Sequence, residues 1–216
     1  MLVAIKKQFL EPAGILQRCI FLLSPANASG IRGKRLLNSE GQSQIAERLR
    51  QSGAPLGEVY QFISSLYFRG KLEYAEKFKN PPPGVTGVYI ITGAGLMLPE
   101  TVVTLDDLRR VSAIPIDAEN SDYRLPLDRD LLRLRELAGH ETDVILLGSI
   151  ATSKYLSPLL AVFGGRLLFP EVFLGRGDMS RGSLLLQCCS TASPLRYLQA
   201  AELVIGRKRA LEEFSA

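Results

Sequence analysis

Three short apolar runs, each followed at once by a turn of small and polar residues, constrain this chain more than any other feature. The runs are Cys19–Leu23 and residues 88–91 and 144–147. A continuous apolar run of this length is typical of a strand whose two faces are both covered. Open α/β sheets bind ligands beyond the carboxyl ends of such strands. The pattern therefore predicts a parallel sheet, with a ligand site at the edge where the turns meet.

Segments with helical spacing alternate with these runs. Apolar residues recur at that spacing in residues 42–52, 57–68, 70–78 and 127–138. We therefore expect one α/β domain over residues 18–216, with a central, mainly parallel sheet of five to six strands and helices on both faces. Residues 1–17 are predicted to form an N-terminal extension or an edge strand.

The C-terminal part of the chain shows a less regular alternation of predicted strands and helices. Residues 183–189 form another apolar run, which predicts a last strand near the C-terminus. Since no long helix precedes this run, that strand is expected to be antiparallel. Residues 113–116 are predicted to be a short strand, and residues 120–126 and 175–182 are predicted to be loops. The final segment, 194–210, has helical spacing only at its end.

Composition limits the classes of partner and the compartment. The net charge of +4 and the pI of about 9.0 favour anionic partners only weakly. Three cysteines without metal-ligand spacing and a single histidine, His140, indicate reduced thiols and no metal site. No apolar run approaches the roughly 20 residues that span a bilayer, and no signal peptide is recognisable. We expect a cytoplasmic protein without a cofactor, and leave the oligomeric state open.

The turn after the first run carries candidate anion-binding residues. Glycines let backbone N–H groups approach an anion, and arginine binds phosphate or carboxylate with two parallel hydrogen bonds. The candidates here are Asn27, Ser29, Arg32 and Lys34. Their spacing matches neither the phosphate-binding loop of nucleotide hydrolases nor the dinucleotide fingerprint. A polar surface loop explains the same residues equally well.

The turn after the third run has the best local geometry for an anion. A strand ends, small residues turn, and a helix begins with free N–H groups. Gly148, Ser149 and Thr152 are the ligand-binding candidates in this turn. The alternative is an ordinary helix start that Thr152 or Ser153 caps.

Two further segments contain charged or aromatic candidates. Arg176 and Arg181 flank Asp178, an arrangement that favours a charged carboxylate able to act as acid/base or nucleophile. A local salt-bridge turn is the alternative. In residues 64–71, Tyr67 and Arg69 would stack on a base or pair with an acidic ligand, or would simply belong to a connection between helices.

Residues 64–108 resemble a group of bacterial α/β domains. The matching pattern is S-x-L-Y-F-R-G-K-x-x-Y-A from Ser64, then a strand, then G-x-G-L-x-L-P-E from Gly93. Some members of that uncharacterised group are suspected of roles in nucleoside or nucleic-acid base metabolism, so the resemblance implies a role of that kind. The turn at residues 92–95 departs from the pattern, which has a Ser-Ala-basic-aromatic sequence there.

Together these features predict an enzyme, of the hydrolase type, that acts on a nucleotide, nucleoside or other phosphorylated small molecule at a glycosidic bond. Asp178 is the predicted catalytic residue. The alternative is a non-catalytic module that binds nucleic acid or protein. A third interpretation is that the polar turns are only structural. A concave pocket that gathers the turns would favour the enzyme, and a flat basic face would favour the module.

Overall fold

The computed structural model describes residues 17–38, 42–150 and 153–203. Within them the main sheet has six strands in the order β4-β3-β1-β6-β7-β8. Their bounds in that order are Gly95–Met97, Val88–Thr92, Cys19–Leu23, Asp143–Leu147, Leu167–Pro170 and Tyr197–Gln199. The expected extension over residues 1–17 falls, apart from Gln17, outside the described residues.

The four inner strands β3, β1, β6 and β7 run parallel, and the two edge strands are antiparallel to their neighbours. Strands β1 and β6 pair along their full length, from Cys19 opposite Asp143 to Leu23 opposite Leu147. The predicted α/β class is confirmed, with a mainly parallel sheet of six strands and an antiparallel strand near the C-terminus.

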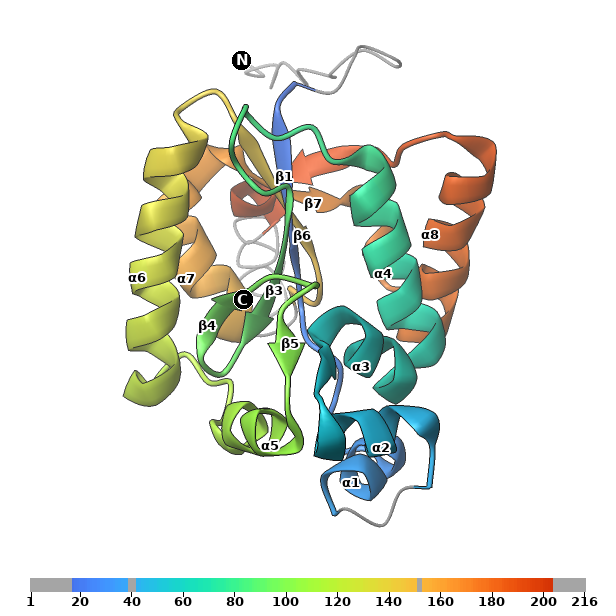
Figure 1. Cartoon of the computed structure of the whole chain (residues 1–216). Helices are drawn as coiled ribbons and strands as arrows, with labels where there is room; N and C mark the ends of the chain where they lie inside the picture. Colours follow the sequence, from blue (N-terminus) through green and yellow to red (C-terminus); the bar gives the residue numbers. More distant parts are fainter. Residues whose placement is uncertain (1–16, 39–41, 151–152, 204–216) are drawn as a thin grey trace, which may run out of the picture.

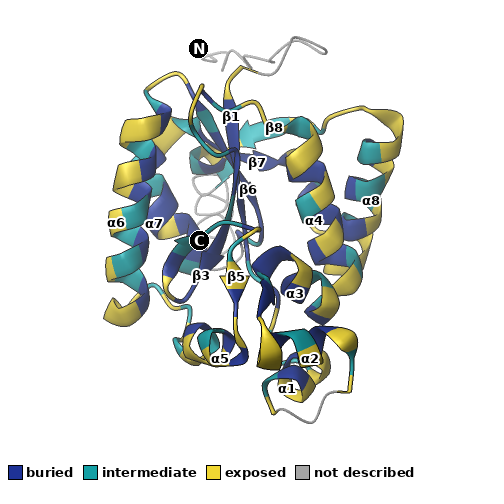
Figure 2. Cartoon of the chain, in the orientation of Figure 1, coloured by how far each residue is buried: buried dark blue, intermediate teal, exposed yellow. Residues whose placement is uncertain are grey.

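Helices cover both faces of the sheet. Helices α4 and α8 lie on one side and α6 and α7 on the other (Figure 1). Their bounds are α4 Ser65–Phe78, α6 Ser121–Ala138, α7 Ser153–Phe163 and α8 Asp178–Thr191. Every residue of β1 is buried, as are Val144–Leu147 of β6, which is why both strands are continuous apolar runs (Figure 2).

A second group of elements lies beyond the carboxyl ends of the parallel strands, in the lower part of Figure 1. It contains four helices and a small antiparallel sheet of β2 and β5. The bounds are α1 Ile31–Leu37, α2 Gln44–Gln51, β2 Ala54–Pro55, α3 Leu56–Ile63, β5 Val102–Val103 and α5 Leu105–Ala113. Two single 3-10 turns, Gly164–Arg166 and Glu171–Phe173, flank β7. No helix among the described residues is long and apolar enough to cross a bilayer.

The prediction of a strand at residues 183–189 is wrong, because this run belongs to helix α8. Only Leu185 and Cys188, three positions apart, are buried in the run, and they form the inner face of the helix. A short apolar run does not distinguish a strand from a buried helix segment. The antiparallel strand near the C-terminus is instead β8, in the part of segment 194–210 for which the sequence predicts no element. Residues 200–203 after β8 are helical, and residues 204–210 lie outside the described part of the chain.

Three shorter predictions are also wrong. Residues 178–182, expected to belong to a loop, form the first turn of α8. Residues 121–126, expected to be a loop, form the first turns of α6, and the Asn120 side chain caps them by accepting a hydrogen bond from the Asp122 N–H. Pro126 lies inside this helix, where it removes the hydrogen bond to the Asp122 carbonyl oxygen. Residues 113–116, expected to be a strand, are the end of α5 and the loop after it.

Helices α4 and α8 approach each other through two glycines, Gly70 and Gly182. A Cβ atom added to Gly182 would lie 2.9 Å from the Leu66 carbonyl oxygen and from the Tyr67 Cα, both backbone atoms of α4. One added to Gly70 would lie 2.8 Å from the Gly182 carbonyl oxygen. The two helices pack this closely only because neither position carries a side chain.

We expect Gly182→Ala to lower the free energy of unfolding by about 1–2 kcal/mol. Overpacking of a tight contact typically costs about 1–3 kcal/mol, and the higher helix propensity of alanine offsets part of this. Urea denaturation checks the change, with Ser183→Ala, an exposed neighbour in the same helix, as the control. A Gly182→Ala protein as stable as the control would show that the two helices move apart freely.

Candidate functional site

A cavity of about 490 Å³ lies beyond the carboxyl ends of β1, β3 and β6. The chain passes from β1 to β3 on one side and later to β6 on the other, so the loops after β1 and β6 diverge and leave a crevice. Its volume lies in the range of small-molecule sites. The wall consists of Ser24, Pro25, Ala26, Asn27, Ala28, Ser29, Tyr60, Ser64, Tyr67, Lys71, Gly93, Val111, Ser112, Ile114, Pro115, Ile116, Ser149, Lys154, Tyr155 and Asp178.

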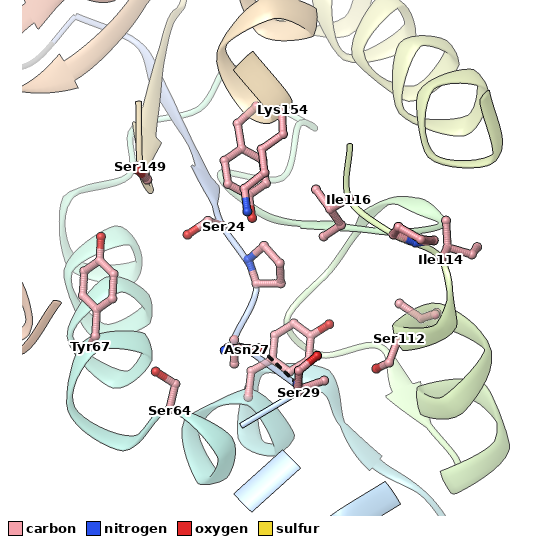
Figure 3. Close-up of a pocket in the computed structure, with 18 of the residues that line it drawn as sticks. Ser24, Asn27, Ser29, Ser64, Tyr67, Ser112, Ile114, Ile116, Ser149 and Lys154 are labelled. Carbon is pink, nitrogen blue, oxygen red and sulfur yellow. Dashed lines mark hydrogen bonds between the residues drawn. The ribbon is translucent and has the colours of Figure 1, made fainter. Parts of the chain in front are cut away.

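The loop after β1 begins with Ser24, whose N–H still donates to the Leu147 carbonyl oxygen at 3.0 Å. Pro25 cannot donate and so ends the pairing. The Asn27 side chain then fixes a turn by accepting a hydrogen bond from the Ser29 N–H at 3.0 Å (Figure 3). These contacts place the Ser24 hydroxyl at the inner end of the cavity.

Lys71 is the least expected side chain of the site, because only 1% of its surface is exposed. It projects from α4, and its Nζ lies 2.5 Å from the Ser24 carbonyl oxygen and 2.9 Å from the Ser24 Oγ. The same Nζ lies 4.6 Å from the centre of the Tyr67 ring and 4.9 Å from that of the Phe68 ring. The amine is therefore held by one residue of the first loop and packed against aromatic faces.

Burial lowers the pKa of the Lys71 amine to about 7, because the charged form loses its hydration. The Asp178 carboxylate partly counteracts this effect on the pKa, and the Arg181 guanidinium adds to it. The Nζ donates to both the carbonyl oxygen and the hydroxyl oxygen of Ser24. Near neutral pH a large fraction of the molecules carries an uncharged amine, whose lone pair is then able to take the hydroxyl proton. A neutral amine with a free lone pair is a base.

Tyr67 contributes a hydroxyl group that no described residue satisfies. The residue is 7% exposed, and its Oη is buried without a hydrogen-bond partner among the described residues. Burial raises the pKa of Tyr67 to about 12, an effect that the nearby Arg181 guanidinium partly offsets without meeting the hydroxyl in hydrogen-bond geometry. The hydroxyl therefore stays protonated and is available to a ligand as a donor.

The rest of the wall is polar on one side and apolar on the other. Ser24, Tyr67 and Ser149 lie on one side of the cavity in Figure 3, and Ile114 and Ile116 lie on the opposite side. Lys154 reaches into the space from the start of α7 (Figure 3). Such a wall suits a small molecule with one charged or polar end and one apolar part.

Five of the residues singled out from the sequence lie on this wall: Asn27, Ser29, Tyr67, Ser149 and Asp178. They come from four separate segments of the chain. Asp178 lies at the rim, because 72% of its side chain is exposed, and its Oδ1 is 3.9 Å from a guanidinium nitrogen of Arg181.

The other candidates lie elsewhere. Arg32 and Lys34 are exposed on α1, Arg69 pairs at the surface with Glu73, and Arg176 is exposed beside Ser180. None of these four side chains lines the cavity. In helix α1 it is Gly33 that faces the loop after β1, since a Cβ on Gly33 would lie 2.2 Å from the Ala28 carbonyl oxygen. The side chains of Arg32 and Lys34 therefore point away from that loop. Thr152 falls outside the described residues.

Two candidates support the wall from behind. Arg181, with 13% of its side chain exposed, donates to the Phe173 carbonyl at 2.9 Å and to the Gly148 carbonyl at 3.4 Å. Gly148 is the position where the turn after β6 passes Ser24, and a Cβ there would lie 3.0 Å from the Ser24 Cβ. Both residues thus position the site and do not line it.

Sequence reasoning missed Lys71 and Ser24. The signal for Lys71 was its spacing, since Tyr67, Lys71 and Tyr74 recur on one face of α4 and the two tyrosines are buried. A lysine on such a face must either extend to solvent or be buried beside a partner. The distance from Ser24 in sequence, 47 residues, hid that partner.

Among the described residues, no group of three or more His, Cys, Asp or Glu side chains could hold a metal ion. Comparison with known proteins gives no match among protein-family models, curated proteins or solved structures. The chemistry must therefore be argued from the cavity itself. The resemblance of residues 64–108 stays a prediction.

Proposed function

We propose that the chain is an enzyme acting on an anionic small molecule of the nucleotide, nucleoside or phosphorylated-metabolite class, bound in the cavity beyond β1 and β6. One observation carries this proposal: a buried amine, Lys71, lies at the inner end of a crevice at the switch point of an α/β sheet. A perturbed base in a concave site is the usual mark of a catalytic centre.

The polar groups of the wall support an anionic ligand. Lys154 is a cation, and Lys71 becomes one when its amine binds a proton. The hydroxyl groups of Ser24, Ser149 and Tyr67 are hydrogen-bond donors on one side of the cavity. A bound anion would raise the pKa of the Lys71 amine, so that binding would take up a proton near neutral pH. The apolar side at Ile114 and Ile116 would accommodate the ring of a base or sugar.

Cleavage at a glycosidic bond, the reaction inferred from the sequence, gains less support than the ligand class. Most glycosidases place two carboxyl groups about the scissile bond. Asp178 is the only carboxylate on the described wall of the cavity, and it lies at the rim. The reacting groups at the inner end are an amine and hydroxyls.

The ligand class is tested by thermal unfolding in a series of nucleotides, sugar phosphates and free bases. A true ligand at a hundred times its dissociation constant stabilises the folded chain by about 2.7 kcal/mol, a rise in Tm of about 5–10 °C at this size. We expect such a rise, growing with concentration, for at least one nucleotide or sugar phosphate.

Two variants test whether the ligand binds in the cavity. Lys154→Ala removes a cation of the wall and should weaken affinity about tenfold, the loss of one charged hydrogen bond. Arg32→Ala removes an exposed cation of α1 and should bind as wild type does. No Tm rise with any compound, together with salt-sensitive binding of single-stranded DNA or RNA, would favour the binding-module alternative.

A further inference from the structure

We infer that Ser24 is a nucleophile, that Lys71 is its general base, and that the cavity cleaves a carboxylic ester or amide of its anionic ligand through an acyl-serine intermediate. This inference rests on the proposed function, because it takes the cavity to be a reaction site. It adds the bond cleaved and the residues that cleave it.

The first support is the order in which the groups lie. Ser24 and Lys71 both line the cavity, and the Lys71 Nζ lies 2.9 Å from the Ser24 Oγ. The Ser24 carbonyl oxygen, 2.5 Å from the same Nζ, fixes the amine in place. A nucleophile, a base within hydrogen-bond reach and a third group that orients the base form the usual arrangement for covalent catalysis. Serine–lysine pairs are a known variant of it.

The second support is independent of Lys71 and concerns Tyr67. Its buried Oη has no partner among the described residues, a costly state that a ligand oxygen would relieve. Figure 3 shows the Ser24 hydroxyl pointing toward the side of the cavity where Tyr67 and Ser149 lie. A neutral O–H donor on that side suits the single oxyanion of a tetrahedral acyl intermediate.

The reaction balances with groups present in the cavity. The Ser24 Oγ attacks the carbonyl carbon while the Lys71 Nζ takes the hydroxyl proton, and the carbonyl electron pair moves to an oxyanion that the Tyr67 hydroxyl binds. The carbon–leaving-group bond then breaks, and the Lys71 ammonium protonates the departing oxygen or nitrogen. Water then attacks the acyl-serine and gives a proton to Lys71. The bond between the acyl carbon and the Ser24 Oγ breaks, the Lys71 ammonium returns that proton to the Oγ, and the acid product leaves.

The test uses a fluorophosphonate, which phosphonylates activated serines with loss of fluoride, and peptide mass spectrometry to locate the label. In the wild-type chain we expect one label, on Ser24. Lys71→Met should slow labelling at least about 100-fold, the usual contribution of a general base, whereas Lys77→Met, an exposed lysine of the same helix, should label as wild type does. Ser24→Ala should remove the label, and Ser190→Ala should keep it.

Every other result overturns the inference. A wild-type chain that is not labelled, a label on Lys71 in place of Ser24, or Lys71→Met labelled at the wild-type rate would each do so. If Lys71→Met does not fold, the position of the label in the wild-type chain and its loss in Ser24→Ala still test whether Ser24 is the nucleophile. The thermal unfolding series with nucleotides and sugar phosphates separates the two proposals. If the Tm rises but Ser24 is not labelled, only the inference that Ser24 is a nucleophile is rejected. If Ser24 is labelled but no compound raises the Tm, only the proposed class of ligand is rejected.

Discussion

Replacing Lys71 with methionine should abolish most of the pH dependence of stability between pH 7.5 and 9. In the folded chain burial lowers the pKa of Lys71 to about 7, whereas an exposed lysine has a value of 10.5. The unfolded chain therefore binds more protons across this range, and the free energy of unfolding of the wild type rises with pH. Each pH unit contributes about 1.4 kcal/mol, or about 2 kcal/mol over the window.

Urea denaturation of both proteins at several pH values measures this difference. Burial also raises the pKa of the Cys19 thiol to about 11, which lowers stability above pH 9, but this effect is common to both proteins and cancels in the comparison. Lys77→Met, which changes an exposed lysine of the same helix, should retain the wild-type slope. Parallel pH curves for wild type and Lys71→Met would mean that the Lys71 amine keeps its proton and that no base exists at the site.

Replacing Arg181 with methionine should lower the free energy of unfolding by about 3 kcal/mol. The guanidinium donates to the carbonyl oxygens of Phe173 and Gly148 and lies over the Phe173 ring, 5.2 Å from its centre. Its loss leaves two carbonyls without their donor, and each such loss costs about 1–3 kcal/mol when buried. At this chain length the Tm should fall by about 6–12 °C.

The same substitution has a second effect that separates it from a simple loss of packing. The Arg181 charge helps to lower the pKa of the Lys71 amine, so its removal should raise that pKa and move the onset of the pH-dependent stability upward. Arg176→Met, an exposed arginine near the start of α8, is the matched control and should change stability by less than about 0.5 kcal/mol. Equal stability of the two variants would show that Arg181 does not hold the wall.

The apolar runs were enough to predict the strands that place the site. Cys19–Leu23 and Val144–Leu147 are buried on both faces, so every residue of these two runs had to be apolar, and the pattern was easy to recognise. Since parallel strands end at one edge, the polar turns after β1 and β6 had to meet there. That argument places Asn27, Ser29 and Ser149 at one cavity without any tertiary information.

Short-range patterns did not determine the C-terminal part or the direction of exposed cations. Residues 183–189 have the composition of a strand, and only the packing of Leu185 and Cys188 on one face shows that they form a helix. Arg32 and Lys34 follow a glycine turn, and only the tight packing of Gly33 against Ala28 turns their side chains away from the cavity.

By itself, then, the sequence determined the layered α/β architecture and the edge of the sheet where polar turns gather, because burial on two faces and strand direction are local properties of the chain. Only the tertiary structure brought Lys71 to Ser24 and left the Tyr67 hydroxyl without a described partner. Those relations depend on how α4 packs between the sheet and α8, across separations in sequence that no local pattern records.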